Sequence, residues 1–479
     1  MKEILKYFNG DELATQAWKS KYAIEGEITP DDMHKRMAKE FTRIEWNYKQ
    51  SDKSYDVNSL SDYGKKLQVD LLKATSADIY SDIYRLFKNF KYVIPGGSVM
   101  SMLGNTTQIG SLSNCFVIGQ PSDSYGGIML KRTEQAQLMK RRGGVGKDLS
   151  LLRPNGAFVN NAAKTSTGPV SFMEVDSEIT REVAQGGRRG ALMETISIVH
   201  PDSGDFITSK QNLDKITGAN ISVKLTTEFM ESVDKNKDFI QQFPINVGAN
   251  MIIGDFDYNE LYSAQNSLNP LWFKKVKAKE LWNSLVHCAW NTAEPGIMFE
   301  DNHHDYSPDG VYPQYRGVTT NPCGEIFMQP YDSCRLIHIN LASFVSNPYT
   351  DSAQFETDKL YEVAYKTMRL ADDLIDLEVE AIDRIIDHIS RAEEPDILEL
   401  DLWIKIQETA KKGRRAGVGF TGLADVFAML GIRYGSEESL EYTDLILYTK
   451  MMGELDSTID LAIIRGTFDG YDAELEKVL

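Results

Sequence analysis

The sequence of 479 residues contains only four cysteines, at positions 115, 288, 323 and 334. So few thiols exclude the disulfide scaffold that is typical of small secreted domains. No stretch approaches the roughly 18 uninterrupted apolar residues of a membrane span. The first residues also have no apolar core of signal-peptide length. These absences predict a cytoplasmic protein that does not bind membranes.

Positive charge is also scarce. Lysine and arginine number 52 against 70 acidic residues, which gives a formal net charge of −18. Such a chain lacks the overall positive field that draws proteins onto nucleic acid, so we expect no nucleic-acid partner. Any anionic ligand must then be held by a local site. With 42% hydrophobic and 25% charged residues, the chain has a globular rather than a disordered composition.

Patterns of helix and strand alternate along the chain after a charged, helical start over residues 1–90. Short apolar runs predict buried strands, and apolar residues at helical spacing predict helices. The predicted strands are 115–119, 196–199 and 296–299, and the predicted helices are 278–289, 360–377 and 440–464. Strands that alternate with helices indicate an α/β fold with parallel pairing.

Two glycine-rich segments match nucleotide-binding patterns in part. Residues 417–422 read GVGFTG, but a basic segment rather than an apolar strand precedes them. We therefore favour a tight strand-to-helix turn over a dinucleotide site. Residues 143–147 read GGVGK, but Asp148 stands where a phosphate loop needs serine or threonine, and the glycine spacing differs.

The sequence predicts no metal site. His303 and His304 are adjacent and lack the HExxH spacing, which favours a polar loop. No CxxC pair occurs, and the closest cysteines, Cys323 and Cys334, are eleven positions apart. Cys288 lies in a predicted helix among apolar residues and is interpreted as inert core. Redox or radical chemistry is the specific use that remains for the other thiols.

Residues 319–325 (TTNPCGE) concentrate the reactive groups. Pro322 and Gly324 predict a rigid, exposed turn. That turn places the thiol of Cys323 between the amide of Asn321 and the carboxylate of Glu325. A carboxylate at this position suits the removal of a substrate proton better than the activation of a thiol.

These residues carry a resemblance to a known family. The NPCGE motif, followed by YDSC at 331–334 and INLAS at 339–343, resembles the catalytic (large) subunit of ribonucleotide reductases. The segments SLSNCFV at 111–117 and QGGRRG at 185–190 agree with it, in the same order along the chain. The resemblance is closest to the adenosylcobalamin-dependent class II.

The resemblance implies a ten-stranded α/β barrel over residues 91–479, after an N-terminal helical lobe over 1–90. The family's barrel continues beyond the segments found here. We therefore expect the chain to be the N-terminal part of a split or truncated enzyme, with a second polypeptide that carries the C-terminal part of the barrel.

The resemblance also assigns an activity, the reduction of ribonucleoside di- or triphosphates to 2′-deoxyribonucleotides for DNA precursor synthesis. Cys323 would carry the thiyl radical that abstracts the 3′ hydrogen, and Glu325 would accept the 3′-hydroxyl proton. Asn321 would bind and orient the ribose. Cys115 and Cys334 would be the redox pair that ends each turnover as a disulfide.

Further residues are assigned to binding in the same way. Ser113 would lie near the substrate phosphate. Asp123, Arg153, Gln185 and Arg189 match regions where the family binds an allosteric deoxynucleotide effector. A solvated basic turn is the alternative for each residue of these loops.

The radical source has two alternatives. The NPCGE form favours adenosylcobalamin, whereas the large subunit of a metal-dependent class I reductase would receive its radical from a separate di-metal small subunit. A third alternative is a nucleotide-binding fragment that is inactive without its C-terminal partner. The resemblance further implies a thioredoxin- or glutaredoxin-like reductant, a homodimer as is common in the family, and the cytoplasm of a bacterial or virus-infected cell.

Overall fold

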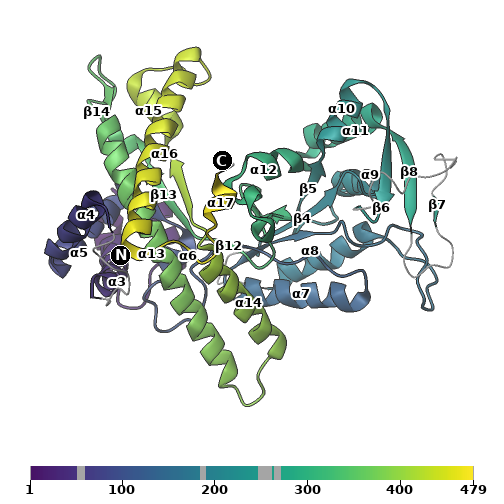
Figure 1. Ribbon diagram of the computed structural model, residues 1–479, viewed down its shortest axis with the longest axis horizontal. Helices are drawn as coiled ribbons and strands as arrows, with labels where there is room; N and C mark the ends of the chain where they lie inside the picture. The colour runs from purple at the N-terminus through teal and green to yellow at the C-terminus, as the bar shows by residue number, and fades with distance from the viewer. Residues whose placement is uncertain (1, 51–59, 184–189, 246–261, 264–270, 478–479) are drawn as a thin grey trace. The chain divides into compact units, whose positions relative to one another are not determined.

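The structure is a computed structural model that describes residues 2–50, 60–183, 190–245, 262–263 and 271–477 (Figure 1). The chain divides into two compact units that each combine separated segments. Unit 1 comprises Met1–Asn114, Cys334–Pro395 and Gln407–Tyr471. Unit 2 comprises Cys115–Ser333, Asp396–Ile406 and Asp472–Leu479. The predicted domain boundary at residue 90 stays a prediction.

Unit 1 is mostly helical. Its helices are α1 (Lys2–Tyr7), α2 (Glu12–Lys21), α3 (Pro30–Gln50), α4 (Asp62–Lys73), α5 (Ser76–Phe87), α6 (Gly97–Met102), α13 (Thr357–Ser390), α15 (Leu423–Leu430) and α16 (Glu437–Arg465). Its strands are β1 (Val93–Pro95), β13 (Leu336–Asn340), β14 (Val345–Ser346), β15 (Gln354–Phe355) and β16 (Gly417–Thr421). Strand β13 is central in a three-stranded sheet, antiparallel to β1 and parallel to β16.

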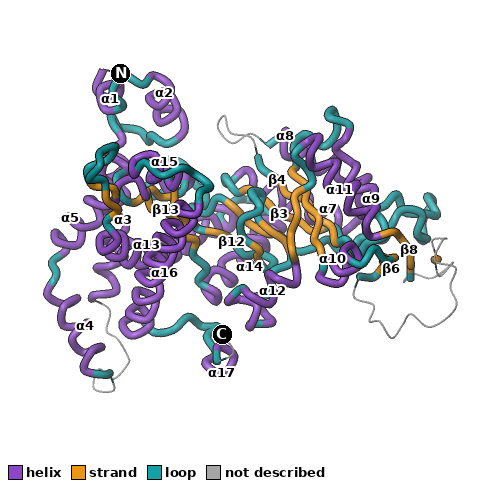
Figure 2. The backbone as a smooth tube through the Cα atoms, turned by 90° about the horizontal axis from the view of Figure 1, so that it is seen from above, coloured by secondary structure: helices purple, strands orange, loops and turns teal. Residues whose placement is uncertain are grey.

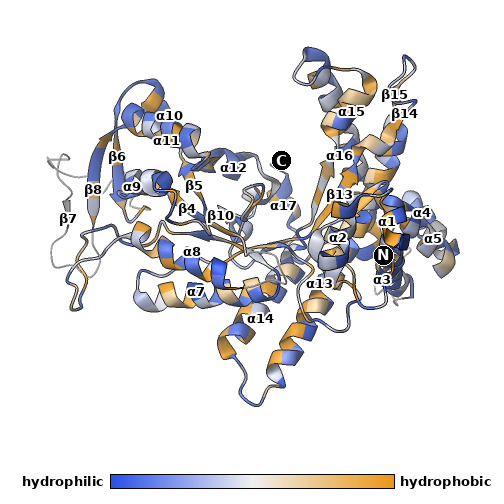
Figure 3. Cartoon of the chain, turned by 180° about the vertical axis from the view of Figure 1, so that it is seen from behind, coloured by the Kyte–Doolittle hydropathy of each residue, from blue (hydrophilic) through white to orange (hydrophobic). Residues whose placement is uncertain are grey.

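The core of unit 1 forms where α3, α5 and α13 pack on this sheet. Phe41, Phe87, Ile339 and Leu374 are fully or almost fully buried in one apolar cluster. Apolar residues recur along α13 and α16 between polar ones (Figure 3). The two long helices approach closely at Gly453, where a Cβ atom would lie 2.6 Å from the backbone oxygen of Tyr361.

A buried ionic network ties α16 to α3 and α13. The guanidinium of Arg465 donates to Glu45 at 3.0 Å and to Asp373 at 2.8 Å. Arg369 of α13 also pairs with Glu45. Burial alone would raise the pKa of Glu45, but the two arginines hold that pKa at about 2. Truncating one member would leave buried charge unpaired, so the network fixes how these helices pack.

Unit 2 contains a parallel sheet and its helices. Its strands are β2 (Cys115–Val117), β3 (Gly144–Asp148), β4 (Leu192–Ser197), β5 (Asn220–Leu225), β6 (Asp238–Phe243), β7 (Tyr262–Ser263), β8 (Trp272–Lys277), β9 (Gly296–Phe299), β10 (Thr319–Thr320) and β11 (Phe327–Met328). Its helices are α7 (Tyr125–Lys140), α8 (Met173–Glu182), α9 (Ser203–Thr208), α10 (Thr227–Asp234), α11 (Ala278–Thr292), α12 (Glu300–Tyr306) and α17 (Ala473–Glu476). The chain crosses from one unit to the other within β12 (Ser333–Cys334) and α14 (Ile397–Gly413).

Strands β2, β3, β4, β5 and β9 lie side by side in this order and are parallel throughout. Figure 2 shows β3 and β4 of this sheet as neighbouring strands. Helices α7 and α8 cover one face, where Lys147 of β3 is buried against Asp176 of α8 and Glu194 of β4. Because side chains alternate along a strand, residues next to Lys147 and Glu194 in sequence point to the opposite face of the sheet, and Cys115 points to that face as well. Register places Gly144 beside Cys115 and Asp148 beside Thr195 on that face.

The α/β class predicted from the sequence is confirmed, with parallel strands at 115–117 and 296–299 and helices at 278–292, 357–390 and 437–465. The GVGFTG segment is a strand-to-helix turn, as expected. Strand β16 ends at Thr421, Gly422 has a φ of 85°, and α15 begins at Leu423. No helix in the described ranges has the length and apolarity needed to cross a membrane.

Candidate active site

The turn that carries Cys323 is fixed by its own hydrogen bonds. The backbone N–H of Gly324 donates to the backbone oxygen of Asn321 at 3.0 Å. The backbone N–H of Asn321 donates to the backbone oxygen of Ile326 at 3.2 Å. The Ile326 N–H donates to the side-chain oxygen of Asn321 at 3.1 Å. Gly324 has a φ of 84°, which favours glycine at this position. The predicted rigid turn is therefore observed, with Cys323 exposed on it.

Residues on three strands of the parallel sheet contact the turn or the residues that lead into it. Asn220 at the start of β5 donates to the backbone oxygen of Pro322 at 3.0 Å. The hydroxyl groups of Thr195 and Thr319 are 2.8 Å apart, and both residues are buried. Gly146 of β3 faces the backbone of Thr320 so closely that a Cβ atom would lie 1.8 Å from its oxygen. The turn thus rests directly on the sheet.

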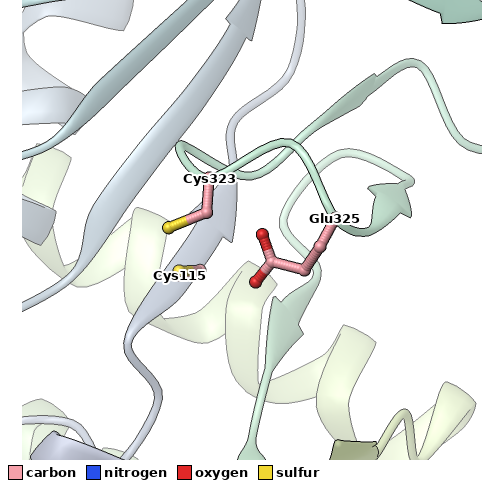
Figure 4. A group of neighbouring side chains, drawn as sticks. All are labelled: Cys115, Cys323 and Glu325. Atoms are coloured by element: carbon pink, nitrogen blue, oxygen red, sulfur yellow. The ribbon is translucent and has the colours of Figure 1, made fainter. Parts of the chain in front are cut away.

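Two thiols and one carboxylate lie close together at this turn. The sulfur atoms of Cys115 and Cys323 and a carboxylate oxygen of Glu325 all lie within 4.8 Å of one another. Figure 4 shows Cys323 and Glu325 on one loop and Cys115 on strand β2, with their reactive ends turned toward a common space. Cys115 is 5% exposed, whereas Cys323 and Glu325 are exposed. A ligand reaching the site therefore meets the latter two side chains first.

The surroundings of Cys115 keep it protonated. The hydrogen bond with Cys323, its own burial and the nearby charge of Glu325 raise the pKa of the Cys115 thiol well above its usual range. Asn321 acts in the opposite direction, because its side chain favours the thiolate of Cys115. The amide nitrogen of Asn321 is fully buried, and among the described residues it finds no other partner. The site thus offers a proton donor, a carboxylate and an amide donor around one exposed thiol.

Gly146→Ala should disturb this arrangement. The added methyl group would overlap the backbone oxygen of Thr320, which cannot rotate away as a side chain would. We expect the substitution to destabilise the protein by about 1–3 kcal/mol, measured by urea unfolding, and to change the rate at which iodoacetamide alkylates Cys323.

Gly204→Ala is the matched control, because the nearest atom to its new Cβ would be 3.8 Å away within α9. Equal stability and equal Cys323 reactivity in both variants would contradict the close approach of β3 and the turn.

A second candidate site is a cavity of about 220 Å³ in unit 2. The carboxylate of Asp123 accepts hydrogen bonds from the backbone N–H and Nε of Arg153, at 3.0 and 2.8 Å. Tyr125 and Phe172 form an edge-to-face aromatic pair in its wall, with ring centroids 6.2 Å apart. Two residues predicted to bind an effector, Asp123 and Arg153, thus line one cavity.

Comparison with known proteins decides the family. The model of the ribonucleotide reductase barrel domain matches residues 113–477. The chain belongs to the ribonucleotide reductase family. The predicted barrel class is thereby confirmed, and the parallel sheet of unit 2 is its half-barrel.

Individual relatives agree with the family assignment. The chain is 30% identical over 408 residues to a vitamin B12-dependent ribonucleoside-diphosphate reductase of Thermoplasma acidophilum, covering 85% of this chain and 46% of that protein. A Mycobacterium tuberculosis protein of the same name is 30% identical over 373 residues, covering 78% of this chain and 46% of that protein. The ribonucleoside-diphosphate reductase large chain of Cryptosporidium parvum is 26% identical, covering 75% of this chain and 43% of that protein. The chain spans about half the length of these relatives.

A solved structure shares the fold. The class Id ribonucleotide reductase alpha subunit of Actinobacillus ureae superposes with a TM-score of 0.64 at 18% identity, covering 96% of this chain and 69% of that one.

Four other residues were predicted for the site: Ser113, Cys334, Gln185 and Arg189. Ser113 and Cys334 belong to unit 1, where both are fully buried, so the Cys115–Cys334 pair stays a prediction. Gln185 and Arg189 lie outside the described residues. Cys288 is buried in α11, in keeping with its interpretation as core.

The expectation of a polar loop around His303 and His304 was wrong. Both lie on helix α12, whose first turn carries Glu300 and Asp301. Acids at the start and histidines at the end of the segment favour a helix through its dipole, and this signal was present in the sequence.

Sequence reasoning missed the residues that support the turn. Asn220, Thr195 and Gly146 come from three strands far from residue 323 in the chain. Lys224, also missed, is buried in the sheet between Asp148 at 3.3 Å and Glu300 at 3.0 Å. The available signal for Lys224 was a lysine inside the short apolar run ISVKL at 221–225, a segment that was not predicted as a strand.

Proposed function

We propose that this chain catalyses the reduction of ribonucleotides to 2′-deoxyribonucleotides through a thiyl radical on Cys323. The observation that carries the proposal is the group of Cys115, Cys323 and Glu325, with ligand atoms within 4.8 Å, around an exposed thiol on a rigid turn. Membership of the family supports this chemistry for the three residues. The relatives from Thermoplasma and Mycobacterium are named ribonucleoside-diphosphate reductases, which supports a ribonucleoside diphosphate as the substrate of this chain.

Each group has a role in the proposed reaction. The sulfur radical of Cys323 takes the 3′ hydrogen atom, which forms an S–H bond and breaks the C3′–H bond. Glu325 takes the proton of the 3′ hydroxyl as general base. Asn321 donates from its buried amide to the ribose and orients it.

Cys115 supplies a proton to the departing 2′ hydroxyl, which leaves as water. Its raised pKa keeps it a thiol at neutral pH and so a competent donor. Cys115 and Cys334 together provide two electrons and two protons and become a disulfide. The S–H of Cys323 then returns its hydrogen atom to C3′, which restores the radical, and Glu325 returns its proton to the 3′ oxygen. Ser113, near the substrate phosphate, is proposed to help bind it.

For the radical source we propose cobalamin in its adenosyl form, because several relatives are named vitamin B12-dependent. This cofactor would supply the unpaired electron when bound. The exposed thiol of Cys323 fits such an external source, since a buried sulfur would be shielded from it. The second candidate, a separate di-metal small subunit, is favoured by relatives named as large chains or large subunits.

The test is an assay of the purified protein with any polypeptide that copurifies with it. Ribonucleoside di- and triphosphates are supplied with a thioredoxin- or glutaredoxin-like reductant, with and without adenosylcobalamin, and deoxynucleotides are separated by chromatography. Cobalamin-dependent product is the expected result. Product only after addition of a di-metal subunit would overturn the cofactor, and no product under either condition would overturn the function.

We also propose that the cavity beside Asp123 and Arg153 binds a deoxynucleotide effector. The carboxylate suits ribose hydroxyl groups, the guanidinium suits phosphate, and the Tyr125–Phe172 pair suits a base. The cytoplasm, where thiols are kept reduced, is the proposed location. Homodimer formation stays a prediction.

Arg153→Ala should weaken binding of a labelled deoxynucleotide and remove its influence on substrate choice. Allosteric coupling of this kind typically changes the affinity for the substrate about 5–150-fold when the effector binds. In Arg153→Ala we expect that factor to fall to one, so that the effector no longer changes substrate affinity. Equilibrium dialysis and competition between two substrates measure it. Arg181→Ala, in the exposed Arg181–Glu178 pair of α8, is the control. Unchanged effector binding in Arg153→Ala would refute the assignment.

A further inference from the structure

We propose that Cys115, Cys323 and Glu325 form a binding site for a soft divalent cation, with Zn²⁺ as the preferred ion, and that this ion blocks the active site. Sequence spacing gave no sign of such a site, because no CxxC pair exists. The fold creates it by bringing the Cys323 turn over strand β2. Metal binding stands on geometry alone, whereas the inhibition rests on the proposed function.

The distances suit a tetrahedral ion after a small movement. With Zn–S bonds of about 2.3 Å, two coordinating sulfurs lie about 3.8 Å apart. The three ligand atoms are within 4.8 Å of one another, so closure requires a shift of at most about 1 Å. Cys323 and Glu325 are exposed on the turn, so their side chains can make that shift toward Cys115, which lies on β2.

The ligand types select the metal. Two thiolates and one carboxylate match zinc and poorly match Mg²⁺ or Ca²⁺, which prefer oxygen ligands only. Binding releases one proton from each thiol, so that Zn²⁺, two thiolates and one carboxylate together carry a charge of −1. The fourth tetrahedral position is left for water.

Asn321 supplies an independent argument. Its amide nitrogen is fully buried, and among the described residues it has no hydrogen-bond partner. A buried N–H group with no partner is the kind of outer donor that orients and strengthens a metal–thiolate bond. The same amide that would orient a ribose therefore also offers a hydrogen-bond donor to a metal-bound sulfur at this site.

Occupation by zinc would have a definite consequence. The sulfur of Cys323 would be held as a thiolate on the metal and could not carry the radical, and Glu325 could not accept a proton. The ion would also fill the space into which these side chains point (Figure 4). Zinc would therefore act as a reversible inhibitor and would shield both thiols from oxidation.

The test uses reduced protein, freed of metal by a chelator, without nucleotide and without oxygen. Titration with Co²⁺ should give a thiolate-to-cobalt charge-transfer absorption that saturates at one equivalent and is abolished by Zn²⁺. Cys323→Ser and Cys115→Ser should each lose this absorption, and Cys288→Ser in α11 should retain it. Absence of the absorption in the wild type, or its persistence in both active-site variants, would overturn the proposal.

A second measurement needs no variant and so does not depend on folding of the mutants. Iodoacetamide labelling mapped by mass spectrometry should show that Zn²⁺ slows alkylation of Cys323, whereas Mg²⁺ does not. Equal labelling with and without Zn²⁺ would also overturn the site. Reductase activity is then measured with added Zn²⁺ and after chelation. Metal binding without any reductase activity would refute the proposed function alone, and activity without metal binding would refute the metal site alone.

Discussion

Cys323→Ser is expected to abolish ribonucleotide reduction, with a loss of at least about 10³-fold. An O–H bond is stronger than an S–H bond, so a serine at this position cannot take up the radical that a thiol carries. The change is almost isosteric at an exposed position. The turn, fixed by backbone hydrogen bonds and by Asn321, should therefore survive. Chromatography of deoxynucleotides measures the loss, and circular dichroism checks the fold.

Cys288→Ser is the matched control for this experiment. Cys288 is buried in α11 and has no place in the proposed reaction, so near-normal turnover is expected, with at most a modest loss of stability. Turnover by Cys323→Ser close to that of the wild type would refute the radical mechanism. Substrate binding, followed by equilibrium dialysis, should remain in both variants, because neither change removes Asn321.

The turn itself was predictable because its determinants are contiguous. Pro322 and Gly324 exclude regular structure, and Asn321 and Glu325 flank the thiol within five residues. Local sequence therefore contained both the conformation and the chemistry of this segment. The position of Cys115 was different. The resemblance assigned it to redox work, but only the folded chain places its sulfur beside Cys323 and Glu325.

The supporting residues show why the remainder was not predictable. Gly146, Thr195 and Asn220 touch or approach the turn through the register of parallel strands, which depends on crossover connections rather than on nearby sequence. A glycine in a GGVGK segment shows only that some close approach is plausible. Which backbone comes close, here that of Thr320, is decided by packing over long sequence distances. The metal ligand set escaped prediction for the same reason.

Glu325→Gln should lower turnover about 10²–10⁴-fold, the range expected when a general base is removed. Glutamine keeps the shape of the side chain but cannot accept the 3′-hydroxyl proton. Because Glu325 is exposed on the turn, the substitution should leave unfolding by urea unchanged. Nucleotide binding should persist, so that kcat falls while the dissociation constant of the substrate stays near its original value.

Two further variants separate a catalytic carboxylate from mere negative charge near the site. Glu325→Asp retains the acid but withdraws it by one methylene, and it should keep more activity than the glutamine variant. Glu231→Gln removes an equivalent charge from the exposed face of α10, where it pairs with Lys235, and should behave as wild type. If Glu325→Gln and Glu231→Gln lost activity equally, Glu325 would act through the general field of an acidic protein. A selective loss in Glu325→Gln, partly restored by aspartate, requires a base held within reach of the substrate by the turn.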